Sequence, residues 1–333
     1  MNYVIKRTAQ AVITVLGVIS ITFGIIRLMP GGPLDYMRAK ISRSNPGMSI
    51  QQVNNMVEAF ASVNPSHPIY IQYVNYVTSV LTGDLGRSFY YQEPVTSILA
   101  NALPWTVFVM TFSLIFSFQL AIVLGAVMAY VEGSRFDNIS SIISILLNSI
   151  PYYLLGMIFL LVFAYRLEWF PSGGTYSARE LEAGLNITFI LDVIHHAALP
   201  ILSFVLTVFG MLALLMRGNC ISILGKDYMQ VAELRGLPKE KMALGYLGRN
   251  AILPMYTEFM ISIGFLFGGS IILEKVFRYT GIGYTMLLAI SARDQTLMMG
   301  AFLIITLAVV IGIYISDLTY GMIDPRIKLG DEQ

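Results

Sequence analysis

The chain has 333 residues, of which 56% are hydrophobic and only 12% are charged, and its mean hydropathy is +0.69. Soluble globular domains carry about 25% charged residues, so this low charge excludes an ordinary cytosolic enzyme and a disordered chain. The net charge of +1 excludes a nucleic-acid-binding protein, which needs a strong basic excess. The composition therefore predicts a polytopic membrane protein, and the single cysteine, Cys220, excludes a disulfide scaffold or a thiolate metal cluster within the chain.

Six apolar stretches are long enough to cross a bilayer as helices, which takes about 20 residues each. The stretches are continuously apolar and do not alternate as barrel strands do, so we predict an all-α membrane protein with about six transmembrane helices. The predicted spans lie near Thr8–Ile26, Thr106–Tyr130, Ile139–Tyr165, Ala197–Met216, Ala251–Leu273 and Leu297–Ile315.

The first span has two interpretations. Lys6 and Arg7 precede an apolar run, as they do in a secretory signal peptide. The run is about 19 residues long, whereas a signal peptide needs only 7–15, and no small-residue cleavage site follows it. We therefore expect an uncleaved membrane anchor.

Basic residues predict the orientation. With the N-terminus inside, the internal segments hold about 11 Lys and Arg in roughly 60 residues, whereas the external segments hold about 10 in roughly 125. We expect a multi-pass protein of the cell membrane with both termini in the cytoplasm. The chain then divides into an N-terminal tip and first helix (1–29), a partly helical extracytoplasmic region (30–102) and a transmembrane core (103–333).

The main internal loop, 217–250, is rich in charged residues. Asp227–Arg235 predicts a short helix, and Gly236 follows it where a left-handed residue ends a helix. Pro238 then suits the first turn of a second helix. This element is either a plain connecting loop or a docking element that lies in a groove on a partner.

The motifs of this loop resemble the EAA signature of permease subunits of ATP-binding-cassette (ABC) importers. The closer match is to the first-permease type of the oligopeptide/dipeptide/nickel family. Two positions depart from the pattern, since Gln230 stands at the EAA glutamate and Val231 at its first alanine. The resemblance covers essentially the whole chain and rests on these segments in order: 83–89, 94–95, 103–106, 169–171, 196–200, 230–232, 234–237, 252–254, 274–277, 281–283, 292–294 and 324–326.

The resemblance implies a type I ABC importer permease and its partners. These would be a second similar permease, two cytoplasmic ATPases and an extracytoplasmic solute-binding protein, alongside membrane lipid and with no nucleic acid.

The chain lacks a phosphate-binding Gly-x-x-x-x-Gly-Lys-Ser/Thr loop, so we expect no enzyme activity and no cofactor in it, with ATP and Mg on the ATPases. The expected substrate is an oligopeptide, and oligosaccharides or nickel are alternatives. The expected ATPase-coupling residues are Asp227, Gln230, Val231, Ala232, Leu234, Arg235, Gly236 and Leu237, with the apolar side chains of Met229, Val231, Leu234 and Leu237 seated on the partner.

Polar residues inside predicted spans are candidates for function. Glu258 either lines the translocation path or pairs with Arg217 or Arg249, and we favour the pair. Asp317 is interpreted as an interfacial or helix-packing residue. Adjacent histidines point about 100° apart on a helix, so we interpret His195 and His196 as capping or interface residues and predict no metal site. The segment 268–270, Gly-Gly-Ser, either packs against the second permease or within the subunit.

Two other functional classes compete with an ABC permease. An ATP-independent secondary transporter or channel would show inverted repeats or broken helices with charged midplane residues. An intramembrane enzyme would need a nucleophile–base or metal constellation, and neither His-Glu-x-x-His nor Gly-x-Ser-x-Gly occurs.

Overall fold

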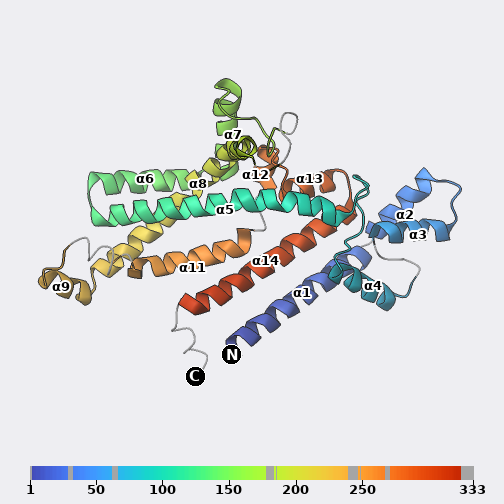
Figure 1. Cartoon of the computed structure of the whole chain (residues 1–333), viewed down its shortest axis with the longest axis horizontal. Coiled ribbons are helices and arrows are strands. Elements are labelled where there is room, and N and C mark those ends of the chain that lie inside the picture. Colours follow the sequence, from blue (N-terminus) through green and yellow to red (C-terminus); the bar gives the residue numbers. More distant parts are fainter. Residues whose placement is uncertain are drawn as a thin grey trace. The chain divides into compact units, whose positions relative to one another are not determined.

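The computed structural model consists of helices over the residues that it describes (Figure 1). An isolated bridge between Arg87 and Pro94 is the one β-type pairing within that part of the chain. The all-α prediction is therefore confirmed. The described residues are 2–28, 33–61, 67–177, 184, 186–238, 247, 249–266 and 271–323.

The chain forms two compact units. Unit 1 comprises residues 1–107, 267–271 and 280–333, and unit 2 comprises residues 108–266 and 272–279. The predicted division into 1–29, 30–102 and 103–333 rests on the expected membrane position and stays a prediction.

In unit 1, the long helices α1 and α14 lie side by side, and α4 and α13 pack against them (Figure 1). Ile19 and Phe23 of α1 and Leu303 of α14 are buried in their shared core. The elements of the unit are α1 (Asn2–Leu28), α2 (Pro33–Ser44), α3 (Ile50–Ala61), α4 (Ile69–Leu81), the start of α5 (Val95–Tyr130), α13 (Ile282–Ser291) and α14 (Gln295–Ile323).

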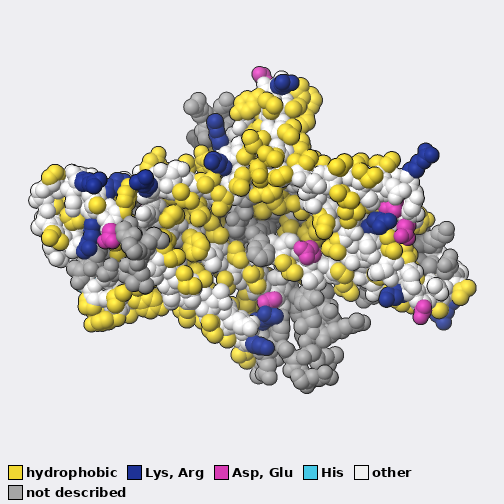
Figure 2. Space-filling view, turned by 180° about the vertical axis from the view of Figure 1, so that it is seen from behind, with side chains coloured by type: hydrophobic (Ala, Val, Ile, Leu, Met, Phe, Trp, Pro, Cys, Tyr) yellow, Lys and Arg dark blue, Asp and Glu magenta, His cyan; other side chains and the backbone are white. Residues whose placement is uncertain are grey.

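In unit 2, α8 is the central helix, because α6, α7 and α11 all pack on it. Hydrophobic side chains cover much of the surface drawn in Figure 2, as expected for helices that face lipid or other membrane subunits. The elements of the unit are the rest of α5, α6 (Arg135–Ser149), α7 (Tyr152–Phe159) with the π-helical turn η1 (Leu160–Arg166), α8 (Ile187–Leu224), α9 (Asp227–Leu234), α11 (Arg249–Leu266) and most of α12 (Ile271–Val276).

Four of the described helices, α1, α5, α8 and α14, are long and apolar enough to cross a membrane. They match the first, second, fourth and sixth predicted spans. The third predicted span, Ile139–Tyr165, is not one straight helix, since the chain bends by 91° between Arg135–Ser149 and Tyr152–Arg166, which form either one broken span or a re-entrant loop. Pro151 explains the bend, because proline lacks an N–H group and holds the preceding residue, here Ile150, in an extended conformation.

The fifth predicted span, Ala251–Leu273, is described only in part. Helix α11 covers its first part and ends at Leu266, and α12 begins at Ile271. The segment 268–270, proposed above as a helix-packing site, lies outside the described residues.

Two glycines let helices of unit 2 approach closely. A Cβ atom on Gly125 of α5 would lie 2.4 Å from the carbonyl oxygen of Ala213 in α8. A Cβ atom on Gly210 of α8 would lie 2.6 Å from the carbonyl oxygen of Ser144 in α6. Helix α8 is therefore packed closely against the backbone of both neighbours.

We expect Gly125→Ala to destabilise the protein by about 1–3 kcal/mol, the usual cost of forcing extra atoms into a packed core. The matched control is Gly17→Ala in α1, where a new Cβ atom meets nothing within 4 Å. Alanine is a better helix former than glycine, so this control keeps or raises stability. Thermal unfolding of both purified variants measures the difference. Equal midpoints would contradict the close packing of α5 on α8.

Candidate functional site

The predicted coupling element is the short helix α9, which follows α8 after Gly225 and Lys226. Gly236 has φ = +68°, and the N–H of Leu237 donates to the carbonyl oxygen of Ala232 at 3.2 Å. This pattern is a Schellman motif, which ends a helix at a left-handed residue. The prediction of a helix from Asp227 closed by Gly236 is confirmed, and its last helical residue is Leu234. The second predicted helix, after Pro238, lies outside the described residues.

Helix α9 has a buried face and an exposed face. Met229 and Ala232 are only 4% and 3% exposed, whereas Tyr228, Val231 and Leu234 are 43%, 47% and 87% exposed. The expectation that Met229 seats on a partner is therefore wrong, because its side chain packs inside its own chain. Tyr228 was not among the predicted coupling residues and lies among the exposed ones.

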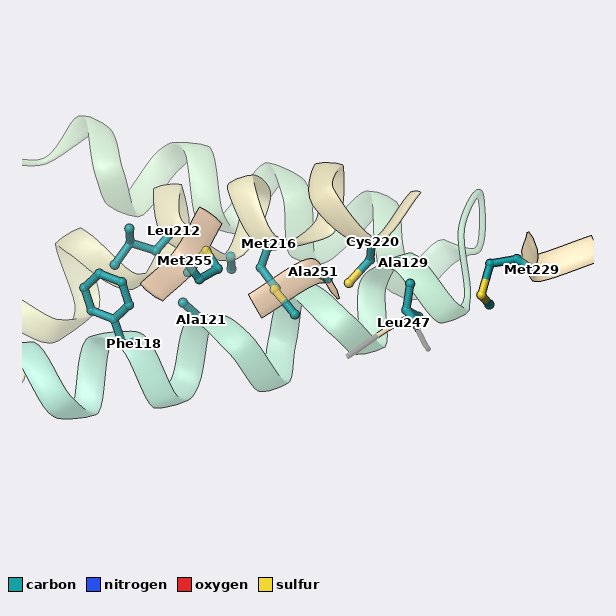
Figure 3. Close-up of a cluster of buried hydrophobic side chains, with 11 residues drawn as sticks. Phe118, Ala121, Ala129, Leu212, Met216, Cys220, Met229, Leu247, Ala251 and Met255 are labelled. Carbon is teal, nitrogen blue, oxygen red and sulfur yellow. The ribbon is translucent and has the colours of Figure 1, made fainter. Parts of the chain in front are cut away.

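Met229 joins a hydrophobic cluster that connects α9 to the long helices of unit 2 (Figure 3). The cluster also contains side chains of three longer helices, α5, α8 and α11, so it links α9 to the packed interior of unit 2. Its buried members are Phe118, Ala121, Ala129, Leu212, Ala213, Met216, Cys220, Met229, Leu247, Ala251 and Met255.

An ion pair between a buried aspartate and a partly exposed arginine lies near the α9 end of α8. Asp137 of α6 is fully buried, and its two oxygens accept hydrogen bonds from Nε and a terminal nitrogen of Arg217 at 2.6 and 2.7 Å. The same carboxylate accepts a hydrogen bond from the N–H of Gly133, and Ser134 caps α6. The pair fastens the turn between α5 and α6 to the end of α8 that leads into α9.

This pair corrects one half of the interpretation of Glu258, because Arg217 binds Asp137 rather than Glu258. The side chain of Arg249, the other suggested partner, lies outside the described part of the chain, so that pairing stays a prediction. Glu258 also lines a cavity in unit 2.

Asp317 lies in unit 1, on helix α14. Its carboxylate pairs with Arg7 of α1 at 3.3 Å, and both side chains are about one-third exposed. Thr8 and Tyr314 form a hydrogen bond at 2.8 Å next to this pair. Asp317 therefore connects α1 to α14 near the two chain ends.

Two segments of the resemblance meet in unit 1. The Ser88 hydroxyl and the N–H of Tyr90 donate to one oxygen of Asp294, at 2.5 and 2.8 Å. The other oxygen accepts from the N–H of Leu297 and so caps α14. The N–H of Tyr91 in turn donates to the Ser88 hydroxyl. Asp294 thus fixes the loop 83–94 on the α13–α14 turn, although more than 200 residues separate the two in sequence.

Two tyrosines near this loop have raised pKa values. Desolvation raises the pKa of Tyr76 in α4 to about 12, and its ring packs against Phe23 with 5.8 Å between centroids. Partial desolvation also raises the pKa of Tyr91, which is 38% exposed, with smaller contributions from the nearby Tyr90, Tyr284 and Asp294. Both phenols therefore stay protonated well above neutral pH.

Two further segments of the resemblance meet in unit 1, where the N–H of Ile282 donates to the hydroxyl of Thr106 at 2.9 Å. In unit 2, the segment 274–277 meets the predicted turn that follows 169–171, where the N–H of Gly174 donates to the carbonyl oxygen of Phe277 at 3.1 Å. These residues therefore hold the turns between helices.

The adjacent histidines make separate backbone contacts. Nε2 of His195 lies 2.8 Å from the carbonyl oxygen of Trp169, and Nδ1 of His196 lies 2.9 Å from that of Asp192. Within the described ranges, no three His, Cys, Asp or Glu residues are grouped so that they could hold a metal ion.

Known proteins resemble the chain over nearly its full length. Residues 121–329 match the family described as "Binding-protein-dependent transport system inner membrane component". The oligopeptide transport system permease protein AppB of Bacillus subtilis is 30% identical over 98% of this chain and 99% of its own length. The di/tripeptide transport system permease protein DppB of Pseudomonas aeruginosa is 27% identical, with the same coverage. The glutathione transport system permease protein GsiC of Salmonella typhi is 26% identical, again over 98% and 99% of the two chains.

The family match spans more than half of the chain, and it includes α9, the buried cluster apart from Phe118, and the Asp137–Arg217 pair. The apolar helices agree with the membrane location that the family name states. The chain is a multi-pass membrane protein that belongs to the family of inner-membrane components of binding-protein-dependent transport systems.

Proposed function

We propose that the chain is the permease subunit of an ATP-driven importer in the cell membrane, and that it imports oligopeptides. With a second, similar permease it forms the translocation path, each subunit contributing half. Two cytoplasmic ATPases bind ATP and Mg, and an extracytoplasmic solute-binding protein delivers the peptide. The names of the relatives, which are permeases for oligopeptides, di- and tripeptides and glutathione, support the substrate class.

The observation that carries this proposal is the exposed face of α9. Tyr228, Val231 and Leu234 present apolar surface outward at the end of a helix that is itself anchored by Met229. An amphipathic helix of this kind fits a hydrophobic groove on a partner. Arg235 lies beside this face and is exposed, so it contributes more to partner specificity than to affinity.

The packing of α9 gives a route from the ATPases to the path. Closure of the ATPases on ATP would displace α9, and the cluster around Met229 would transmit the displacement to α5, α8 and α11. ATP can shift such a two-state equilibrium only through unequal affinity for the two states. The close contacts at Gly125 and Gly210 support movement of these helices as one body.

The same proposal gives the orientation of the chain in the membrane. With α9 and both termini in the cytoplasm, the loop 83–94 faces outward. Asp294 holds this loop, and its exposed tyrosines, Tyr90 and Tyr91, lie on the side from which the solute-binding protein arrives.

Reconstitution tests the proposal. Liposomes containing this chain, the second permease and both ATPases should take up tripeptide only when ATP and the peptide-loaded binding protein are supplied on opposite sides. This chain alone, without the ATPases, should take up none. Uptake by the isolated chain would instead indicate an ATP-independent transporter or channel. Retention of oligosaccharide or nickel, and not peptide, by the binding protein would overturn the substrate class.

A further inference from the structure

Unit 2 contains a mostly apolar cavity of about 340 Å³ between α5, α8 and α11. This volume lies within the range of small-molecule sites, which are typically apolar with a few polar groups. The apolar lining residues recur every fourth position, so they form one stripe along each helix. The stripes are Met110, Leu114 and Phe118 on α5, and Phe204, Val208 and Leu212 on α8.

Among the described residues that line the cavity, Glu258 is the one with an ionisable side chain. Within the described residues, its carboxylate has no ion pair or side-chain hydrogen bond. Ser262 also lines the cavity. Its hydroxyl donates to the backbone carbonyl oxygen of Glu258 at 2.8 Å and not to the Glu258 carboxylate.

The described side chains of α5 and α8 offer Glu258 no free cation. Helix α5 contains no Asp, Glu, Lys, Arg or His along its length. Helix α8 contains one permanent cation, Arg217, and Asp137 binds it through both oxygens. A carboxylate in such surroundings is unfavourable unless a cation from outside the chain compensates for it.

We propose that this cavity is a subsite for the basic side chain of a transported peptide, an inference that rests on the peptide import proposed for the chain. Lysine and arginine combine an apolar stem with a charged head. The stem would lie along the apolar stripes of α5 and α8, and the ammonium or guanidinium group would pair with Glu258. The importer should therefore favour peptides with Lys or Arg over peptides with Glu at the same position.

The test compares uptake of Ala-Lys-Ala and Ala-Glu-Ala by the complete importer in liposomes, with one binding protein in all samples. Glu258→Gln should lower the ratio of Lys-peptide to Glu-peptide uptake at least tenfold, and Glu258→Asp should retain most of the preference. The matched control, Glu132→Gln, removes the same charge at an exposed position outside the cavity and should leave the ratio unchanged.

Three outcomes would overturn the proposal. If the wild-type importer and Glu258→Gln give the same ratio, only the subsite is wrong. If Glu258→Gln releases the second permease in size-exclusion chromatography, Glu258 serves that interface instead. If the wild-type importer takes up neither peptide, the proposed function fails, and the subsite fails with it.

Discussion

Leu234→Asp should weaken binding of the ATPases to the permease at least tenfold and abolish the stimulation of ATP hydrolysis by peptide-loaded binding protein. Leu234 is 87% exposed at the end of α9, so the substitution costs this chain little stability by itself. In the complex, an aspartate would place an unpaired charge in an apolar groove. The loss of a central apolar contact commonly costs about 2 kcal/mol or more, and the buried charge adds to it.

The measurement is the affinity of purified ATPases for the solubilised permease pair in the absence of the binding protein. Ile50→Asp is the matched control, because Ile50 is 81% exposed at the start of α3, in the region we expect outside the cell. It should bind the ATPases like the unaltered chain. Full affinity and full stimulation with Leu234→Asp would show that α9 is not the ATPase contact.

Local signals in the sequence predicted α9 well. A Schellman motif forms between residues only five positions apart, such as Ala232 and Leu237, so Gly236 was sufficient to indicate the end of the helix. The bend before Pro151 also has a local signal, the Ile150-Pro151 pair. It was missed because the apolar run continues through it, and hydropathy reports only how apolar a segment is.

Contacts between residues that lie far apart in the sequence could not be predicted from it. Ser134 and Asp137 have the spacing of an N-terminal capping box, which could have indicated the start of α6. Nothing in the sequence links Asp137 to Arg217, which lies 80 residues away. The buried face of α9 was equally hidden, because apolar residues occur on both of its faces and only the packing of Met229 tells them apart.

The buried pair between α6 and α8 leads to the second large prediction. Arg217→Met should lower the free energy of unfolding by about 3–5 kcal/mol, the usual cost of leaving one partner of a buried ion pair alone. Asp137 is fully buried. Without Arg217, the described hydrogen bonds leave its carboxylate with one donor from outside α6, the N–H of Gly133. Thermal unfolding of the purified protein should show a midpoint lower by about 4–7 °C.

The chain contains a matched control for this experiment in Arg7→Met. Arg7 also pairs with an aspartate across two helices, but this pair is about one-third exposed, and exposed pairs contribute about 0–1 kcal/mol. The double variant Asp137→Asn/Arg217→Met should regain most of the lost stability, because it removes the unpaired charge as well. If Arg217→Met and Arg7→Met lower the midpoint equally, or if the double variant is no more stable than Arg217→Met, then the pair does not fasten the α5–α6 turn to α8. A displacement of α9 would in that case reach α5 through the apolar cluster around Met229 alone.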